Sequence, residues 1–162
     1  MSNLYKTYYK SPIGTIEIIG TNVEVQIISI LNDDFSNFKN LGNSKELEKC
    51  KHQLEEYFTG KRTSFDLKLN PQGTIFQQKV WQELLNVKFN TTRTYLEQTK
   101  AIGDVKAIRA VASANGKNPI AIVIPCHRII GSNGSLTGYA GGLWRKKWLL
   151  DHENPVKQQS LF

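Results

Sequence analysis

The stretch Asn118–Arg128, which reads NPIAIVIPCHR, is the most informative segment of the sequence. Its apolar run, Ile120–Ile124, is expected to be extended and to lead into a bend made rigid by Pro125. Cys126 follows this proline, and His127 comes directly after it. A cysteine reacts as its thiolate, which is favoured by a nearby base, a positive neighbour or a helix N-terminus. Cys126 is therefore a candidate nucleophile, and His127 is its candidate base.

The dipeptide alone leaves a second interpretation open. Side chains that follow one another on a strand point to opposite faces, so a turn or a water molecule would have to connect Cys126 with His127. The alternative is a buried, inert cysteine beside an exposed histidine.

Two short helices are predicted upstream of this stretch. Thr94 and the glutamate three residues later form a capping box that begins a helix over Tyr95–Ile102. Gly103 can end this helix, and a second helix over Val105–Ala114 continues until Asn115-Gly116. Two short helices joined by a turn that contains glycine have the outline of a helix-turn-helix. Many helix pairs that bind no DNA share this outline.

The second of these helices has a surface suited to a narrow groove. Arg109 projects from it, and the helix carries several small residues, which leave little side-chain bulk to keep it from a groove: Ala107, Ala110, Ala112, Ser113 and Ala114. The alternative for Arg109 is an ion pair with an acidic neighbour.

The N-terminal part predicts a different architecture. Three stretches contain residues that favour β-strands: Tyr5–Tyr9, Thr15–Ile19 and Val23–Leu31. A helix follows from Ser44 to Gly60, and Cys50 falls on its apolar stripe, which indicates a buried structural cysteine.

The overall prediction is an α+β fold of two domains. Residues 1–70 form a structural domain with a small antiparallel sheet and a helix, and residues 71–162 form a mainly helical domain with the helix-turn-helix and Cys126. Thr74 begins a further helix in the second domain, and Gly141–Glu153 is its last helix.

Composition sets limits on the class of protein. The 162 residues are 40% apolar and 22% charged, which predicts a globular, soluble chain and excludes a disordered polymer. No apolar run approaches a membrane span and no signal peptide is recognisable, so we expect a cytoplasmic protein. Two cysteines are too few for a disulfide scaffold, and neither has zinc-ligand spacing.

Positive charge is concentrated in the second half of the chain. The formal charge is +7, and residues 71–150 hold 11 basic and 3 acidic side chains. This excess suggests a polyanionic partner, because binding to phosphates releases counterions from nucleic acid. A solvated basic face is the alternative.

The motifs from about residue 73 to residue 153 together resemble those of the O6-alkylguanine-DNA alkyltransferases, also called methylated-DNA–protein-cysteine methyltransferases. The segments that carry the resemblance lie in the family's order and spacing: Gly73–Gln77, Tyr95, Arg109–Val111, Asn118-Pro119, Ile124–Arg128, Gly138–Gly142, Leu149-Leu150 and Glu153. Residues 1–70 resemble the family's variable N-terminal domain only in outline.

The resemblance implies single-turnover DNA repair by direct damage reversal. An alkyl group would pass from O6-alkylguanine, and from O4-alkylthymine, in duplex DNA to Cys126 after base flipping. His127 would take the thiol proton through a water molecule, Glu153 would orient the imidazole, and Asn118 would brace the segment. Tyr95 would donate a hydrogen bond to the departing guanine.

The resemblance also implies contacts to the base and the duplex. Tyr139 would form a wall of the pocket, the Ala140 N–H would face O6, and the carbonyls of Cys126 and Ile129 would accept from the guanine amine. Arg109 would fill the space vacated by the flipped base as the helix-turn-helix enters the minor groove. Further DNA contacts are expected at Ala107, Ala110 and Ser132.

The sequence departs from the family in a few places. Lys88-Phe89-Asn90 stands where relatives usually have Pro-Tyr-Gly, and Thr94 replaces the usual serine. Ala112 and Ser113 occupy positions where glycine is frequent. The zinc ligands known from animal members are missing, so we expect no metal. We also expect no cofactor and a monomer.

Two rival functions remain. One is a DNA-binding module without chemistry, against which the joint presence of Cys126, His127 and Glu153 argues. The other is a cysteine hydrolase or thiol transferase that acts on small substrates, against which Arg109 and the basic second half argue.

Overall fold

A computed structural model of the chain describes residues 3–32 and 42–155. The chain divides into two compact units, one made of Met1–Gln72 with Pro119–Ala121 and the other of Gly73–Asn118 with Ile122–Phe162. A three-stranded antiparallel sheet and five α-helices make up the described regular structure, together with short 3-10 turns and a two-stranded pair. The predicted α+β class is confirmed.

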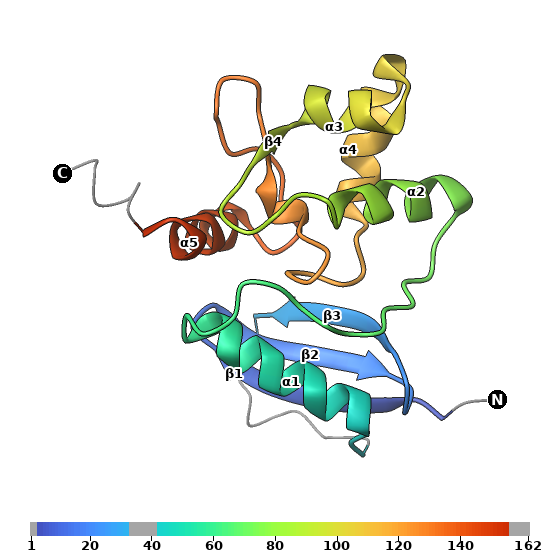
Figure 1. Cartoon of the computed structure of the whole chain (residues 1–162), viewed down its shortest axis with the longest axis vertical. Helices are drawn as coiled ribbons and strands as arrows, with labels where there is room; N and C mark the ends of the chain where they lie inside the picture. The colour runs from blue at the N-terminus through green and yellow to red at the C-terminus, as the bar shows by residue number, and fades with distance from the viewer. Residues whose placement is uncertain (1–2, 33–41, 156–162) are drawn as a thin grey trace. The chain divides into compact units, whose positions relative to one another are not determined.

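The first unit contains the sheet, whose three strands lie side by side in Figure 1 in the order β1-β2-β3. They are β1 (Tyr5–Ser11), β2 (Gly14–Gly20) and β3 (Val25–Leu31). Alternate residues such as Ile16 and Ile18 are completely buried. A Cβ atom at Gly20 would collide with the carbonyl oxygen of Glu24, so only glycine allows the chain to turn this closely before β3.

Helix α1 (Lys45–Phe58) lies across one face of this sheet (Figure 1). Ser44 begins it as predicted, because its hydroxyl accepts a hydrogen bond from the Leu47 N–H at 3.2 Å. Cys50 is completely buried on the apolar face of the helix. Leu47 and Leu54, three residues before it and four after it, are buried on the same face. Burial raises the pKa of its thiol to about 12. The prediction of a buried Cys50 is confirmed.

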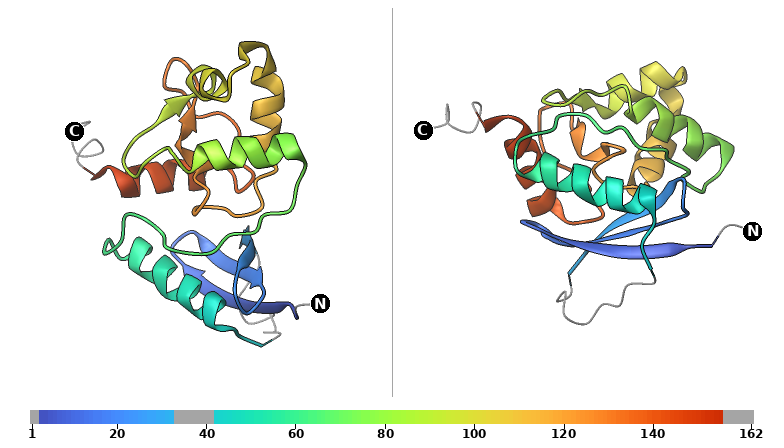
Figure 2. Two further views of the ribbon diagram at one scale, coloured as in Figure 1. Left: turned by 45° about the vertical axis from the view of Figure 1, so that its right-hand side comes forward. Right: turned by 60° about the horizontal axis from the view of Figure 1, so that its bottom comes forward.

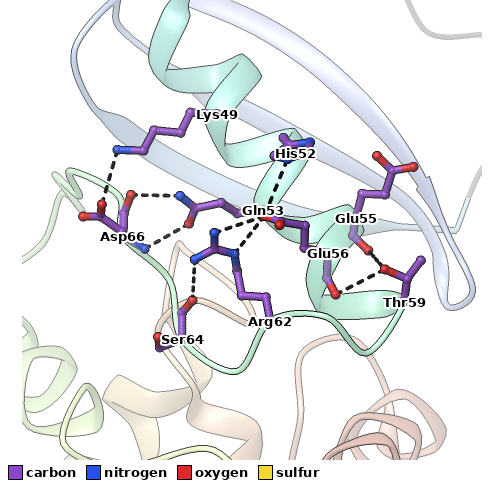
Figure 3. A network of polar contacts seen from close by, with 9 residues as sticks. All are labelled: Lys49, His52, Gln53, Glu55, Glu56, Thr59, Arg62, Ser64 and Asp66. Carbon is purple, nitrogen blue, oxygen red and sulfur yellow. Dashed lines mark hydrogen bonds and ion pairs between the residues drawn. The ribbon is translucent and has the colours of Figure 1, made fainter.

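The segment after α1 is tied to the helix by polar contacts, which Figure 3 shows. The Gln53 side-chain amide makes two hydrogen bonds with the main chain of Asp66, at 3.1 Å and 2.9 Å. Arg62 forms an ion pair with Glu56 at 3.0 Å. The Gln53 bonds satisfy both backbone groups of Asp66, in a segment that has no strand partner along most of its length.

The second unit is mainly helical. In Figure 2, α2, α3 and α4 lie together, and loops separate them from α5. Its elements are α2 (Ile75–Leu84), β4 (Arg93–Thr94), α3 (Tyr95–Ile102), η2 (Val105–Ala107), α4 (Ile108–Gly116), η3 (Cys126–Arg128), β5 (Ile129–Ile130) and α5 (Leu143–Glu153). None of the helices in the described ranges is long and apolar enough to cross a membrane.

Helices α3 and α4 follow each other closely, as the helix-turn-helix outline requires. Gly103 ends α3 in the left-handed conformation, with φ of 105°. The predicted single helix over Val105–Ala114 instead begins with the 3-10 turn η2 and runs on to Gly116. Asn115 does not break α4, because its side chain forms two buried hydrogen bonds with Gln98 of α3, at 2.7 Å and 2.8 Å.

Candidate active site

Cys126 lies at the start of the 3-10 turn η3, directly after Pro125. The expectation that Ile120–Ile124 is extended was wrong beyond Ile120: Ile120 forms a parallel β-bridge with Ile28, but Ala121–Val123 are turn residues and Ile124 is a bend. Ile122 adopts a φ of +72°, which is rare for a β-branched residue and costs on the order of 1–3 kcal/mol. The side chain of Ile122 is nevertheless 1% exposed, so burial offsets this strain. The chain reverses here and delivers Cys126 in a turn rather than on a strand.

Asn118 supplies the direct polar contact of the thiol. Its side-chain Nδ2 donates to the Ile124 carbonyl at 2.7 Å and to the Cys126 Sγ at 3.3 Å. Burial raises the pKa of the Cys126 thiol, whereas the Asn118 hydrogen bond and the positive charge of Lys146 act in the opposite direction. The thiol is thus protonated at neutral pH and needs a base to react.

His127 and Glu153 form a buried pair behind the cysteine. His127 Nε2 lies 2.7 Å from Glu153 Oε2, and the two side chains are 0% and 1% exposed. Burial lowers the pKa of His127 despite the carboxylate beside it. The pKa of Glu153 lies well below its usual range: burial acts to raise it, and the bonds from His127 and Arg128 overcome that effect.

The contact with Glu153 determines the tautomer of the imidazole, because an ionised carboxylate only accepts hydrogen bonds. A neutral histidine beside an ionised carboxylate carries its proton on Nε2, where it donates to Glu153. Nδ1 is then an acceptor, and it is buried without a hydrogen-bond partner among the described residues. A buried, unpaired acceptor on a neutral imidazole is suited to take a proton.

Arg128 is a residue of this site whose role the sequence did not reveal. Its Nε and Nη2 donate to Glu153 at 2.8 Å and 3.0 Å, and its Nη1 donates to the Val87 carbonyl at 2.7 Å. The Phe89 ring lies 5.9 Å from its guanidinium carbon. The segment that departs from the family pattern therefore contacts the residue that holds Glu153. Asn90 adopts a φ of +61° there, a conformation that asparagine tolerates better than most residues do.

A pocket of about 490 Å³ opens in front of Cys126. Tyr95 of α3 and the segment Thr137–Tyr139 both line it. The remaining lining residues come from α4 and its end: Ile108, Arg109, Ala112, Asn115 and Gly116. A volume of this size accommodates a small organic ligand. The Tyr139 hydroxyl is buried without a hydrogen-bond partner in the described part of the chain, and burial holds its pKa well above the usual range.

The Thr137–Tyr139 segment is held in place by two side chains. Tyr95 donates its hydroxyl to the Thr137 carbonyl at 2.9 Å. Lys146, which is completely buried, donates to the carbonyls of Thr137 and Gly138 at 2.9 Å and 3.2 Å. Burial lowers the pKa of Lys146. The role of this lysine has no sequence signal, because its partners are backbone carbonyls of a loop.

Of the other predicted residues, Arg109 lines the pocket, whereas Ala107, Ala110, Ile129, Ser132 and Ala140 are not among its lining residues. Arg109 is exposed and has no ion pair with any described residue, which removes the acidic-neighbour alternative. Ala110, Ser132 and Ala140 are exposed, Ala107 is half-buried, and Ile129 is completely buried in β5. Ile108 also lines the pocket, although the sequence pattern singled out only Arg109 and the small residues of this helix. The described residues contain no cluster of three or more His, Cys, Asp or Glu side chains suited to a metal ion.

Sequence comparisons match almost the whole described chain to one family. Residues 75–155 match the 6-O-methylguanine DNA methyltransferase DNA binding domain, and residues 4–71 match the ribonuclease-like domain of the same methyltransferase. A methylated-DNA–protein-cysteine methyltransferase of Methanosarcina barkeri is 45% identical over 158 residues, covering 93% of this chain and 97% of that protein.

Solved structures give the same result for the fold. The crystal structure of the O6-methylguanine methyltransferase of Mycobacterium tuberculosis superimposes with a TM-score of 0.84 at 38% identity, covering 94% of both chains. A structure of the Mycobacterium tuberculosis protein in complex with DNA has a TM-score of 0.82 at 40% identity and covers 91% of both chains.

Proposed function

The chain belongs to the 6-O-methylguanine DNA methyltransferase family, whose members repair DNA by direct transfer of an alkyl group to a cysteine, and we propose that Cys126 is the acceptor in this chain. One observation carries the assignment. Cys126 faces a pocket large enough for a base, and a neutral His127 held by Glu153 lies behind it. Cys50, by contrast, is enclosed in the apolar face of α1.

The reaction begins with removal of the thiol proton. His127 accepts this proton at Nδ1 through a water molecule, and Glu153 stabilises the imidazolium that results. Asn118 keeps its hydrogen bond to the sulfur as negative charge develops there. The Sγ then attacks the alkyl carbon, so an S–C bond forms while the bond from that carbon to O6 breaks.

The electron pair of the broken bond stays on the guanine, and the resulting anion takes up one proton, equivalent to the one that left the thiol, to become the repaired base. Tyr95 assists by donating its phenolic hydrogen bond to the base, in exchange for the Thr137 carbonyl. Tyr139 forms the wall against the base, and the Ala140 N–H faces O6. The carbonyls of Cys126 and Ile129 accept from the exocyclic amine. The S-alkylcysteine has no route back to a thiol, so each chain reacts once.

The substrate is double-stranded DNA that contains O6-alkylguanine, and O4-alkylthymine is a second substrate. Residues 71–162 bind this DNA as a monomer, while residues 1–70 have a structural role. The net positive charge of residues 71–150 supports phosphate binding. Helices α3 and α4 enter the minor groove, where Ala107, Ala110 and Ser132 contact the DNA and Arg109 fills the place of the flipped base.

Mass spectrometry of the intact protein tests this function. After incubation with a duplex containing O6-methylguanine, we expect one adduct of about 14 Da per chain, the mass of one CH₂, located on Cys126. A protein that only binds DNA would gain no mass. A hydrolase would turn over repeatedly and leave no stable adduct on the chain.

A further inference from the structure

Ile108 is a large apolar side chain in an unusual place. It is the first residue of α4, it lines the pocket in front of Cys126, and it is 37% exposed. The same face of α4 continues toward its C-terminus with much smaller or polar groups: Ala112, Asn115 and Gly116. Ile108 is thus the main apolar group that α4 brings to the pocket.

The exposed part of the Ile108 side chain contributes little to the stability of the fold. Apolar area stabilises a protein when it leaves water, and the exposed part of Ile108 has not left it. Val105 lies three residues earlier in the 3-10 turn η2 and is 53% exposed. Val105 is in η2 and Ile108 begins α4, and residues three apart along a helix lie on the same side, so we expect Val105 and Ile108 to form a short apolar ridge beside Arg109. The two residues of this ridge differ in their position, because Ile108 lines the pocket and Val105 does not.

We propose that Ile108 is an apolar wedge that holds the damaged nucleotide out of the duplex, acting beside Arg109. This inference rests on the proposed function and assigns a residue that positions the DNA without touching the reacting atoms. Its branched side chain packs against the deoxyribose of the extruded nucleotide and the neighbouring base pair. Apolar side chains inserted at base steps stabilise unstacked DNA in this manner.

The chemistry of the two neighbours is complementary. Arg109 brings charge and hydrogen-bond donors, which suit phosphates and base edges. Ile108 brings an apolar surface that presents no donor or acceptor, so its contact discriminates little between bases. Partial exposure places it where a flipped nucleotide enters the pocket, whereas a group that contacts the base alone would be enclosed.

The test compares substrates that do and do not require extrusion. We expect Ile108→Ala to slow transfer from a duplex containing O6-methylguanine about tenfold, because the apolar contact is lost. Transfer from the free base O6-benzylguanine should stay within about twofold of the unsubstituted protein, since no nucleotide has to leave a stack. The loss should also shrink to about twofold on a single-stranded oligonucleotide carrying the same lesion.

Two further variants serve as controls. Val105→Ala removes the other member of the ridge and should leave the rates on duplex and free base unchanged within about twofold. Ile108→Val keeps a branched apolar side chain and should retain most of the duplex rate. Thermal melting of all three variants checks that each is folded.

Several outcomes would overturn the wedge. Equal losses of Ile108→Ala on duplex and free base would make Ile108 a wall of the base pocket. An unchanged duplex rate would show that Arg109 acts without it. Failure of the unsubstituted protein to form any adduct would instead reject the proposed function, so the two failures are distinguishable.

Discussion

The two cysteines of the chain share one property and differ in another. Burial raises the pKa of both thiols, to about 12 for Cys50. Around Cys50, the nearby acidic Glu46 raises the pKa further. Around Cys126, the hydrogen bond from Asn118 and the charge of Lys146 act against burial. The pKa direction alone therefore does not distinguish an inert cysteine from a reactive one, and the polar neighbours do.

The local backbone explains why only one cysteine has such neighbours. Cys50 lies within the helix α1, whose inward face is lined by apolar residues at helical spacing. Cys126 lies in a 3-10 turn after a segment of turns, and this geometry brings Asn118 to the sulfur and His127 to Glu153. A thiol in a helical stripe is surrounded by what packs well, whereas a turn can gather polar groups from several segments.

The largest effect is expected from removing each sulfur in turn. Cys126→Ala should abolish the adduct from O6-methylguanine duplex, because no other described thiol faces the pocket. Cys50→Ala should leave one adduct per chain. Binding of the duplex by Cys126→Ala should persist, since affinity comes mainly from phosphate contacts. Intact-mass measurement and a DNA-binding titration check both variants, and an adduct on Cys126→Ala would contradict the assignment.

Glu153→Gln should slow transfer on the order of a hundredfold at neutral pH. The substitution removes the negative charge of Glu153. This charge stabilises the imidazolium of His127, and the carboxylate that carries it accepts two hydrogen bonds from Arg128. Because burial raises the pKa of the Cys126 thiol, the unassisted thiolate forms only above about pH 8.5, and the variant should partly recover there. Single-turnover rates between pH 6 and 10 measure this, and a variant that had merely lost its fold would show no recovery.

Asn118 offers a smaller change at the same sulfur. Asn118→Ala removes the hydrogen bonds to Sγ and to the Ile124 carbonyl, so the pKa of the Cys126 thiol should rise further. We expect transfer to slow about tenfold. Asn118→Asp should slow it more than alanine does, because a carboxylate cannot donate to the thiolate and repels it. The pH dependence of alkylation by iodoacetamide reports this pKa without DNA. Profiles of both variants that equal the profile of the unsubstituted protein would show that Asn118 only fills space.

The sequence predicted the elements whose signals are local. The capping boxes at Thr74 and Thr94 are both formed, with Gln77 and Glu97 as the third helical residues. The left-handed glycine at Gly103 is also where the pattern placed it. Each of these features is decided by residues within one turn of a helix, so a short window contains the whole cause.

The features that the sequence did not predict depend on distant partners. The run Ile120–Ile124 is apolar enough for a strand, yet it pairs with β3 only at Ile120, where the Ala121 N–H donates to the Ile28 carbonyl at 3.0 Å, and the chain reverses at Ile122. Arg128 reaches Val87 across 41 residues. A charged residue in a motif has no sequence signal for which carbonyl or carboxylate it will contact. Most of the proposed catalytic residues came from the family resemblance rather than from spacing.

The smallest effect is expected at Cys50, where the change should affect stability and leave the chemistry intact. Cys50→Ser places a hydroxyl in a completely buried position on the apolar face of α1, and an unpaired buried hydroxyl costs about 1–3 kcal/mol. Cys50→Ala is the matched control, because it removes the sulfur without adding a polar group and should cost less. Denaturant unfolding of both variants measures the difference at neutral pH.

The folded-state pKa of Cys50 lies above the unfolded value of about 8.5, so the stability contributed by its thiol is present below that pH and decreases as pH rises toward about 12. The deficit of Cys50→Ser relative to the unsubstituted protein should therefore narrow between pH 8.5 and pH 10. A deficit that stays constant over this range would mean that Cys50 is less enclosed than the packing of α1 indicates.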